Sequence, residues 1–181
     1  YFGIGSMIPG FFSEKTNQLV ARHFDIAEQL EKLPATWSLP KSDKALHTPL
    51  DYRYIQWRYS QCPVASYGAL IDADKFGIIF RVKKINRFIE LRICETWIMP
   101  GSNGYSAAQK ALKSICKTIG PIIITCAPSP LFSYDTNKML GLFGPFKKGP
   151  VTTIRPLKMT DLSQFNLFNH WQPSMGSMEL F

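Results

Sequence analysis

Two side chains of this sequence could exchange protons with a bound substrate. Glu95 stands near the end of a predicted strand, where its carboxylate could act as a general base. Tyr134 lies near a short predicted helical piece, where its phenol could act as a general acid. Either residue could instead belong to the surface or to the packing of the fold, and the sequence leaves this alternative open.

The cysteines and histidines predict neither a metal site nor a thiol nucleophile. The four cysteines form no CxxC motif, and the three histidines lie far apart without ligand spacing. Cys94 has no histidine near it in the sequence that could activate its thiol. We therefore expect free, buried thiols in a cytoplasmic protein, with a disulfide as the open alternative.

The composition of the chain is that of a globular protein. Of its 181 residues, 45% are hydrophobic and 19% are charged, which is enough apolar surface for a sizeable core. The net charge of +8 favours anionic partners such as phosphorylated cofactors, nucleotides, nucleic acid or acidic glycans. No apolar run approaches the roughly 20 residues that cross a membrane, so we expect no membrane span.

The first third of the chain predicts short elements joined by an exposed connection. Residues 12–24 could form a strand with polar ends. Asp25 is a plausible N-cap for a helix that ends before Pro34. Residues 35–49 are predicted to be an exposed connection, and the aromatic block at 50–60 predicts a short helix stopped by a proline.

A sheet is predicted next. Three consecutive antiparallel strands are expected at 64–71, 76–85 and 88–98, with a polar turn before the second and a two-residue turn before the third. In the third strand, apolar residues alternate with Glu90 and Arg92, which is the pattern of a half-buried strand.

A helix and a parallel strand should follow. One apolar stripe at helical spacing consists of Ala108, Ala111, Leu112, Ile115, Cys116 and Ile119. Ser106 and Gln109 resemble a capping box, and Gly120 is a typical helix end. The apolar run 122–127 predicts a buried strand, reached by a right-handed parallel crossover. A short helical piece at 134–143 and a final strand at 151–157 complete an α+β fold.

Several motifs resemble one superfamily, the GNAT acyltransferases. "DYRYIQWRYSQCP" resembles the "WRY...P" element that precedes the second half of two-part GNAT proteins from bacterial polysaccharide-biosynthesis loci. "ELRI" at 90–93 and the ending "VTTIRPL" resemble their strand and their "RPL" motif. The tail "WQPSMGSMELF" is similar to their "W....GD.D.F" ending, with Ser177 where an Asp is usual.

This resemblance implies a GNAT-like fold, with a mixed, mostly antiparallel sheet and helices on both faces. Residues 51–181 would form the GNAT-like domain. Residues 1–50 would form an N-terminal segment that begins with the last strand of an absent first half. That half, or a second copy of the chain, would then be a partner. The implied activity is transfer of an acyl group from acetyl-CoA or another acyl-CoA to a small amine or amino sugar.

The resemblance also places the cofactor. GNAT enzymes bind the coenzyme A pyrophosphate on backbone N–H groups where a helix begins after the third core strand, with the pattern Q/RxxGxG/A. The residues at that place are Gly101, Ser102, Asn103, Gly104, Tyr105 and Ser106. The leading Gln or Arg is absent, and Tyr105 stands where a small residue is usual. In the implied reaction, Glu95 would be the base and Tyr134 the acid.

Three hypotheses remain open from the sequence alone. The chain could be an acyltransferase, a non-catalytic GNAT-like module that completes a two-part protein, or a basic binding domain. Nucleic acid is the weaker partner for the third, because no RNP, KH or helix-turn-helix pattern occurs. The tyrosines and the tryptophan of the aromatic block would either pack at the entrance to the domain or line an acceptor pocket.

Overall fold

The structure is a computed structural model that describes residues 2–4, 14–39, 46–99, 103–126 and 171–172. The short predicted helical piece at 134–143 and the predicted strand at 151–157 lie outside these residues. Among the described residues, no helix is both long and apolar enough to cross a membrane.

A mixed sheet forms the centre of the described fold. Its strands are β1 (Phe2–Ile4), β3 (Gly68–Asp72), β4 (Phe76–Ile85), β5 (Phe88–Ile98) and β6 (Ile123–Cys126). Their spatial order is β1-β6-β5-β4-β3. Only β5 and β6 pair in parallel, and the other three pairs are antiparallel. The predicted α+β class with a mixed, mostly antiparallel sheet is therefore confirmed.

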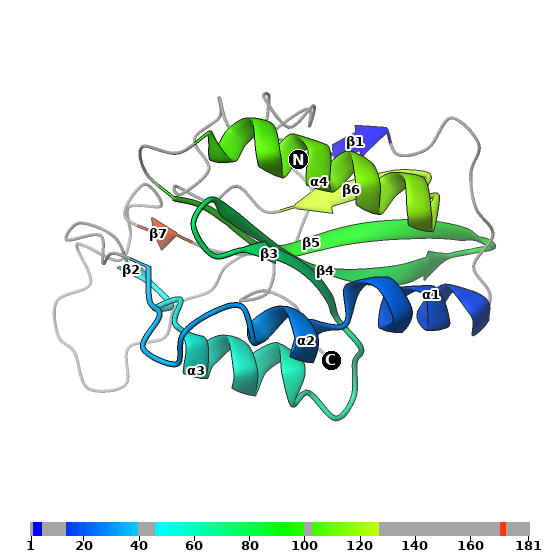
Figure 1. The fold of residues 1–181 in the computed structure, drawn as a ribbon. Coiled ribbons are helices and arrows are strands. Elements are labelled where there is room, and N and C mark those ends of the chain that lie inside the picture. The colour runs from blue at the N-terminus through cyan, green and yellow to red at the C-terminus, as the bar shows by residue number, and fades with distance from the viewer. Residues whose placement is uncertain (1, 5–13, 40–45, 100–102, 127–170, 173–181) are drawn as a thin grey trace, which may run out of the picture.

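Helices cover both faces of this sheet (Figure 1). The helical elements are α1 (Glu14–Phe24), α2 (Ile26–Leu30), α3 (Tyr52–Ile55), the π-helix η1 (Gln56–Ser60) and α4 (Gly104–Ile119). In Figure 1, α4 runs along one side of the sheet, and α2 and α3 lie on the other. Two separate apolar cores correspond to these two layers. One joins α1 and α4 to the sheet, and the other joins α2, α3 and η1 to it.

The strand expected within residues 12–24 is wrong, because this segment forms helix α1. Its buried residues are Thr16, Val20 and Phe24, which recur every four positions and so lie on one helical face. Phe24 meets Phe80 of β4 edge-on, with ring centroids 5.5 Å apart. The packing of this face onto the sheet selects the helix over the strand.

The later elements follow the predicted order. The β3–β4 and β4–β5 hairpins form as expected, although β3 begins at Gly68 and not at residue 64. Asn86 takes a left-handed conformation (φ 55°) in the second, two-residue turn. Gly120 ends α4 in a left-handed conformation (φ 68°) and leads to β6. The capping box predicted at Ser106 is wrong, because the helix already begins at Gly104 and Asn103 is its N-cap residue.

A small second sheet joins two distant parts of the sequence. Strand β2 (Leu46–His47) pairs in parallel with β7 (Trp171–Gln172). The predicted exposed connection at 35–49 therefore contains a short strand. It also contains Trp37, which is buried and packs against Trp97 of β5 at a ring distance of 4.9 Å.

We predict that Gly77→Ala destabilises the protein by about 1–3 kcal/mol. Gly77 lies opposite Trp97 on the neighbouring strand, and an added Cβ would collide with the buried indole ring. Urea unfolding of the single variant measures the cost. In a Trp97→Leu background the indole ring atoms that block the Cβ are absent, so the same substitution should cost less. An equal cost in both backgrounds would contradict the proposed collision.

Candidate active site

A bulge in strand β5 places Glu95 on the face of the sheet that α2 and α3 cover. Ile79 of β4 pairs with Glu95, and the next residue, Phe80, pairs with Ile93, so Cys94 has no partner residue on β4. Cys94 belongs to the same core as Ile79 and Trp97. The extra residue therefore reverses the alternation of the strand and turns the carboxylate of Glu95 toward this core.

A π-helical turn brings the aromatic block to the same place. Asp51 caps α3, because its carboxylate accepts a hydrogen bond of 2.7 Å from the backbone N–H of Tyr54. The helix then widens, and the N–H of Gln61 donates to the carbonyl of Gln56, five residues earlier, at 2.9 Å. Arg58 and Tyr59, although adjacent, are both buried in this turn.

A buried hydrogen bond joins these two irregular segments. The phenol of Tyr59 donates to Oε1 of Glu95 at 2.6 Å, across 36 positions of sequence. Tyr59 is 1% exposed and Glu95 is 8% exposed. A hydrogen bond between a phenol and a carboxylate is of the strong, charge-assisted kind, which stabilises an acidic side chain in the interior.

Two further side chains shape the electrostatics around this bond. The pKa of Tyr54 is raised, mainly by burial and then by the negative charge of Glu95. Burial works against the charged form of Arg58, but the neighbouring phenols of Tyr67, Tyr59 and Tyr54 outweigh it and raise the pKa of the guanidinium. A cationic Arg58 therefore lies close to the same tyrosine as the carboxylate of Glu95.

The phenol of Tyr59 is held in its protonated form. Burial, followed by the charge of Glu95, raises the pKa of Tyr59 far above the ordinary phenol value. The phenol can therefore donate a hydrogen bond at any working pH, and it does not compete with Glu95 for the role of base. The arrangement offers one carboxylate that can accept a proton and two neutral phenols beside it.

A second buried carboxylate lies farther along β5. Glu90 accepts hydrogen bonds from the guanidinium of Arg92 at 3.1 Å and from the hydroxyl of Thr125 on β6. The alternation in this strand predicts a half-buried strand with an outward polar face, and that prediction fails for Glu90, which is only 5% exposed. Because Thr125 and Arg92 are neighbours across the parallel pair, this cluster ties β6 to β5.

The predicted cofactor loop is described from Asn103 onward. The side chain of Asn103 makes no capping hydrogen bond, and no acidic residue occurs in the first turn of α4. Gly104 is buried, whereas Tyr105 and Ser106 are exposed. Tyr105 thus directs its ring toward the surface, and the positive end of the helix dipole is not neutralised by an acidic side chain of its own first turn.

Sequence reasoning found some parts of this site and missed others. Glu95 lies in it as a buried carboxylate, while Gly101, Ser102 and Tyr134 lie outside the described residues. The partnership of Glu95 with Tyr59 and its proximity to Tyr54 were missed. The sequence did carry a signal for this bulge. Glu90 and Arg92 are two positions apart, whereas Glu95 is three positions after Arg92, and this break in the alternation of polar residues predicts a bulge.

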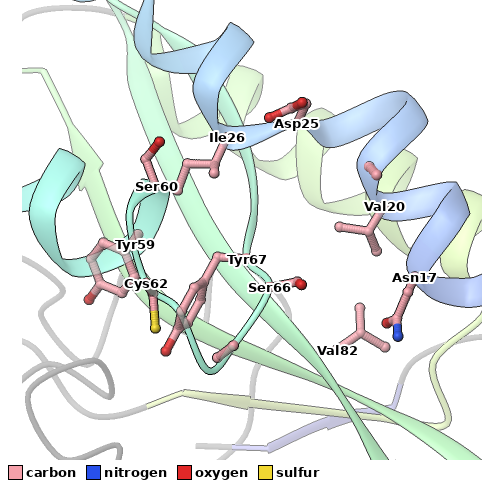
Figure 2. A pocket seen from close by; sticks show the side chains of 12 residues that line it. Asn17, Val20, Asp25, Ile26, Tyr59, Ser60, Cys62, Ser66, Tyr67 and Val82 are labelled. Atoms are coloured by element: carbon pink, nitrogen blue, oxygen red, sulfur yellow. The ribbon is translucent and has the colours of Figure 1, made fainter.

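A pocket of about 250 Å³ lies beside the ring of Tyr59 (Figure 2). It opens between α1, the start of α2, the segment 60–67 and β4. Tyr59 and Tyr67 form one side, with their rings edge-on at 5.0 Å. The hydroxyl of Tyr59 donates to Glu95, which is not among the residues that line this pocket.

Metal ligands and reactive thiols do not gather in the described part of the chain. No group of three or more His, Cys, Asp and Glu side chains there could hold a metal ion. All four cysteines are free, with Cys94 and Cys126 buried. Burial raises the pKa of Cys126 to about 11, which keeps its thiol protonated at neutral pH.

No family model, no curated protein and no solved structure matches this chain.

We predict that Tyr59→Phe lowers the free energy of unfolding by about 1–3 kcal/mol, because Glu95 loses its buried donor. Urea unfolding measures this change. The matched control is Tyr52→Phe, since the phenol of Tyr52 is only half-buried and forms no hydrogen bond with the described residues. Its cost should stay below about 0.5 kcal/mol. Equal costs for the two variants would show that the hydrogen bond contributes nothing.

The Cys126 thiol predicts a loss of stability at alkaline pH. Its pKa rises from 9.0 to about 11 on folding, so its contribution is complete below pH 9 and is lost as the pH rises toward 11. The loss is on the order of 2 kcal/mol. Unfolding free energies measured from pH 8 to pH 11 should therefore fall less steeply for Cys126→Ala than for the parent. Parallel curves would contradict this assignment.

Proposed function

We propose that this chain is an acyl-CoA-dependent N-acyltransferase of the GNAT type, or the C-terminal half of one, that acts on a small amine or amino sugar. The observation that carries the proposal is the parallel β5–β6 pair. The last described pair of its ladder joins Ile93 to Cys126, and the next residues of β5 are Cys94, at the bulge, and Glu95. Helix α4 is the next element after β5 in the sequence.

This arrangement suits a thioester donor for two reasons. Ligands of sheets with parallel strands bind beyond the carboxyl ends of those strands, which is where α4 begins. The first turn of α4 carries no acidic side chain, and the positive end of its dipole favours a phosphate group. Gly101, Ser102, Asn103, Gly104, Tyr105 and Ser106 are the proposed pyrophosphate-binding residues.

The proposed reaction uses Glu95 as the base. The amine nitrogen of the acceptor attacks the thioester carbonyl, a C–N bond forms and the C–S bond breaks. Glu95 accepts the proton from the nitrogen, and the leaving thiolate takes a proton from the proposed acid, Tyr134. Tyr59 holds the carboxylate of Glu95 in place through its 2.6 Å hydrogen bond.

We predict that Glu95→Gln lowers kcat by about 100-fold or more while the Kd for acetyl-CoA stays within twofold. Turnover is measured as release of the coenzyme A thiol with a panel of amino sugars and amino acids, and binding by calorimetry. Glu28→Gln is the control, because Glu28 is exposed on α2. Both its kcat and its Kd should equal those of the parent.

Two outcomes would overturn the proposal. If the parent binds no acetyl-CoA, the alternative of a non-catalytic GNAT-like module is favoured. If Glu95→Gln turns over at the parent rate, Glu95 is not the base.

A further inference from the structure

A second pocket lies at the far end of the β4–β5 hairpin, away from the start of α4. The β3–β4 ladder ends at Gly68 and Phe80, so β4 continues from residue 81 without β3 beside it. A pocket of about 480 Å³ opens there between β4, helix α1 and the segment 62–66. It shares Asn17, Cys62, Ala65, Ser66 and Val82 with the pocket beside Tyr59, and in Figure 2 Asn17 points from α1 toward Val82.

The lining of this pocket is cationic. Arg81, Lys83 and Lys84 line it, and none of its lining residues is acidic. Lys83 and Lys84 form no ion pair with any carboxylate of the described residues. Glu90, which lies opposite Lys83 on β5, is already engaged by Arg92 and Thr125. The positive charge of the pocket is therefore not balanced by an acidic residue of its own wall.

The arginine of the neighbouring strand is already compensated. Arg81 lies directly opposite Arg92 in the β4–β5 ladder, and like charges in that relation destabilise a sheet. Glu90 compensates Arg92, while the guanidinium of Arg81 lies over the ring of Tyr67, 5.9 Å from its centroid.

The remaining wall restricts the kind of anion. The amide of Asn17 and the hydroxyl of Ser66 can donate neutral hydrogen bonds, and Pro63, Val64 and Val82 offer an apolar surface. Three cations suit a group of more than one negative charge, and the volume is in the usual range of small-molecule sites. We propose that this pocket binds a phosphorylated small molecule of about nucleotide size at the open edge of β4, where Arg81 and Lys83 reach its phosphate or diphosphate from one face of the strand and Lys84 from the other.

This site is separate from the proposed acyl-CoA site, because β5 runs from the hairpin turn beside it to α4 at the other end. Calorimetry with the full chain tests it, using ADP, inorganic pyrophosphate and adenosine as probes in the presence of saturating acetyl-CoA, which occupies the proposed pyrophosphate-binding residues at the start of α4. ADP and pyrophosphate should bind, and adenosine should not at the same concentration. The double variant Lys83→Gln/Lys84→Gln should bind ADP about 100-fold more weakly, since each lost cation costs about tenfold.

The matched control removes two lysines elsewhere. Lys110→Gln/Lys113→Gln alters exposed residues of α4 and lowers the net charge equally, and its ADP affinity should stay within twofold of the parent. Equal weakening in both double variants would show nonspecific attraction and overturn the proposal. So would an absence of ADP binding by the parent, or adenosine binding as tight as ADP. Loss of acetyl-CoA binding in Lys83→Gln/Lys84→Gln would contradict the separation of the two sites.

Discussion

The organisation of this protein depends on one buried carboxylate and the phenol that holds it. Glu95 is placed in the interior by a strand bulge, and a carboxylate there is costly unless it is hydrogen-bonded. Tyr59 supplies a hydrogen bond at 2.6 Å from a π-helical turn. Both segments depart from regular geometry, and such departures persist where a particular placement of side chains compensates their cost.

The hydrogen bond between Tyr59 and Glu95 also connects the fold to the proposed chemistry. On one face, α4 packs on the sheet and begins at the carboxyl end of β5. On the other, the aromatic block closes over Glu95, while Glu90 and Thr125 tie β6 to β5. In the proposed function, a cofactor bound at the start of α4 and the base Glu95 would therefore both lie near the end of strand β5. The cationic pocket lies toward the other end of the hairpin.

The sheet and α4 could be predicted from the sequence, because their signals are local. The alternation at 76–98 and the apolar stripe of α4 depend on residues a few positions apart. Helix α1 could not, since its short stripe becomes helical through packing against Phe80 and α4. The carboxylate of the site was found because it stands in an apolar strand. Its donor was missed because Tyr59 and Glu95 are 36 residues apart, and no local pattern predicts that their side chains meet.

The most direct test of the account is the ionisation of Tyr59, followed by NMR of the protein with ¹³C-labelled tyrosine rings. The Tyr59→Phe variant assigns the resonance. The account predicts that the ring carbon bonded to oxygen keeps its protonated shift up to pH 11, because burial and the charge of Glu95 raise the pKa of Tyr59. Titration near the ordinary phenol value of about 10 would contradict it, because the phenol would then be neither buried nor bound to a carboxylate.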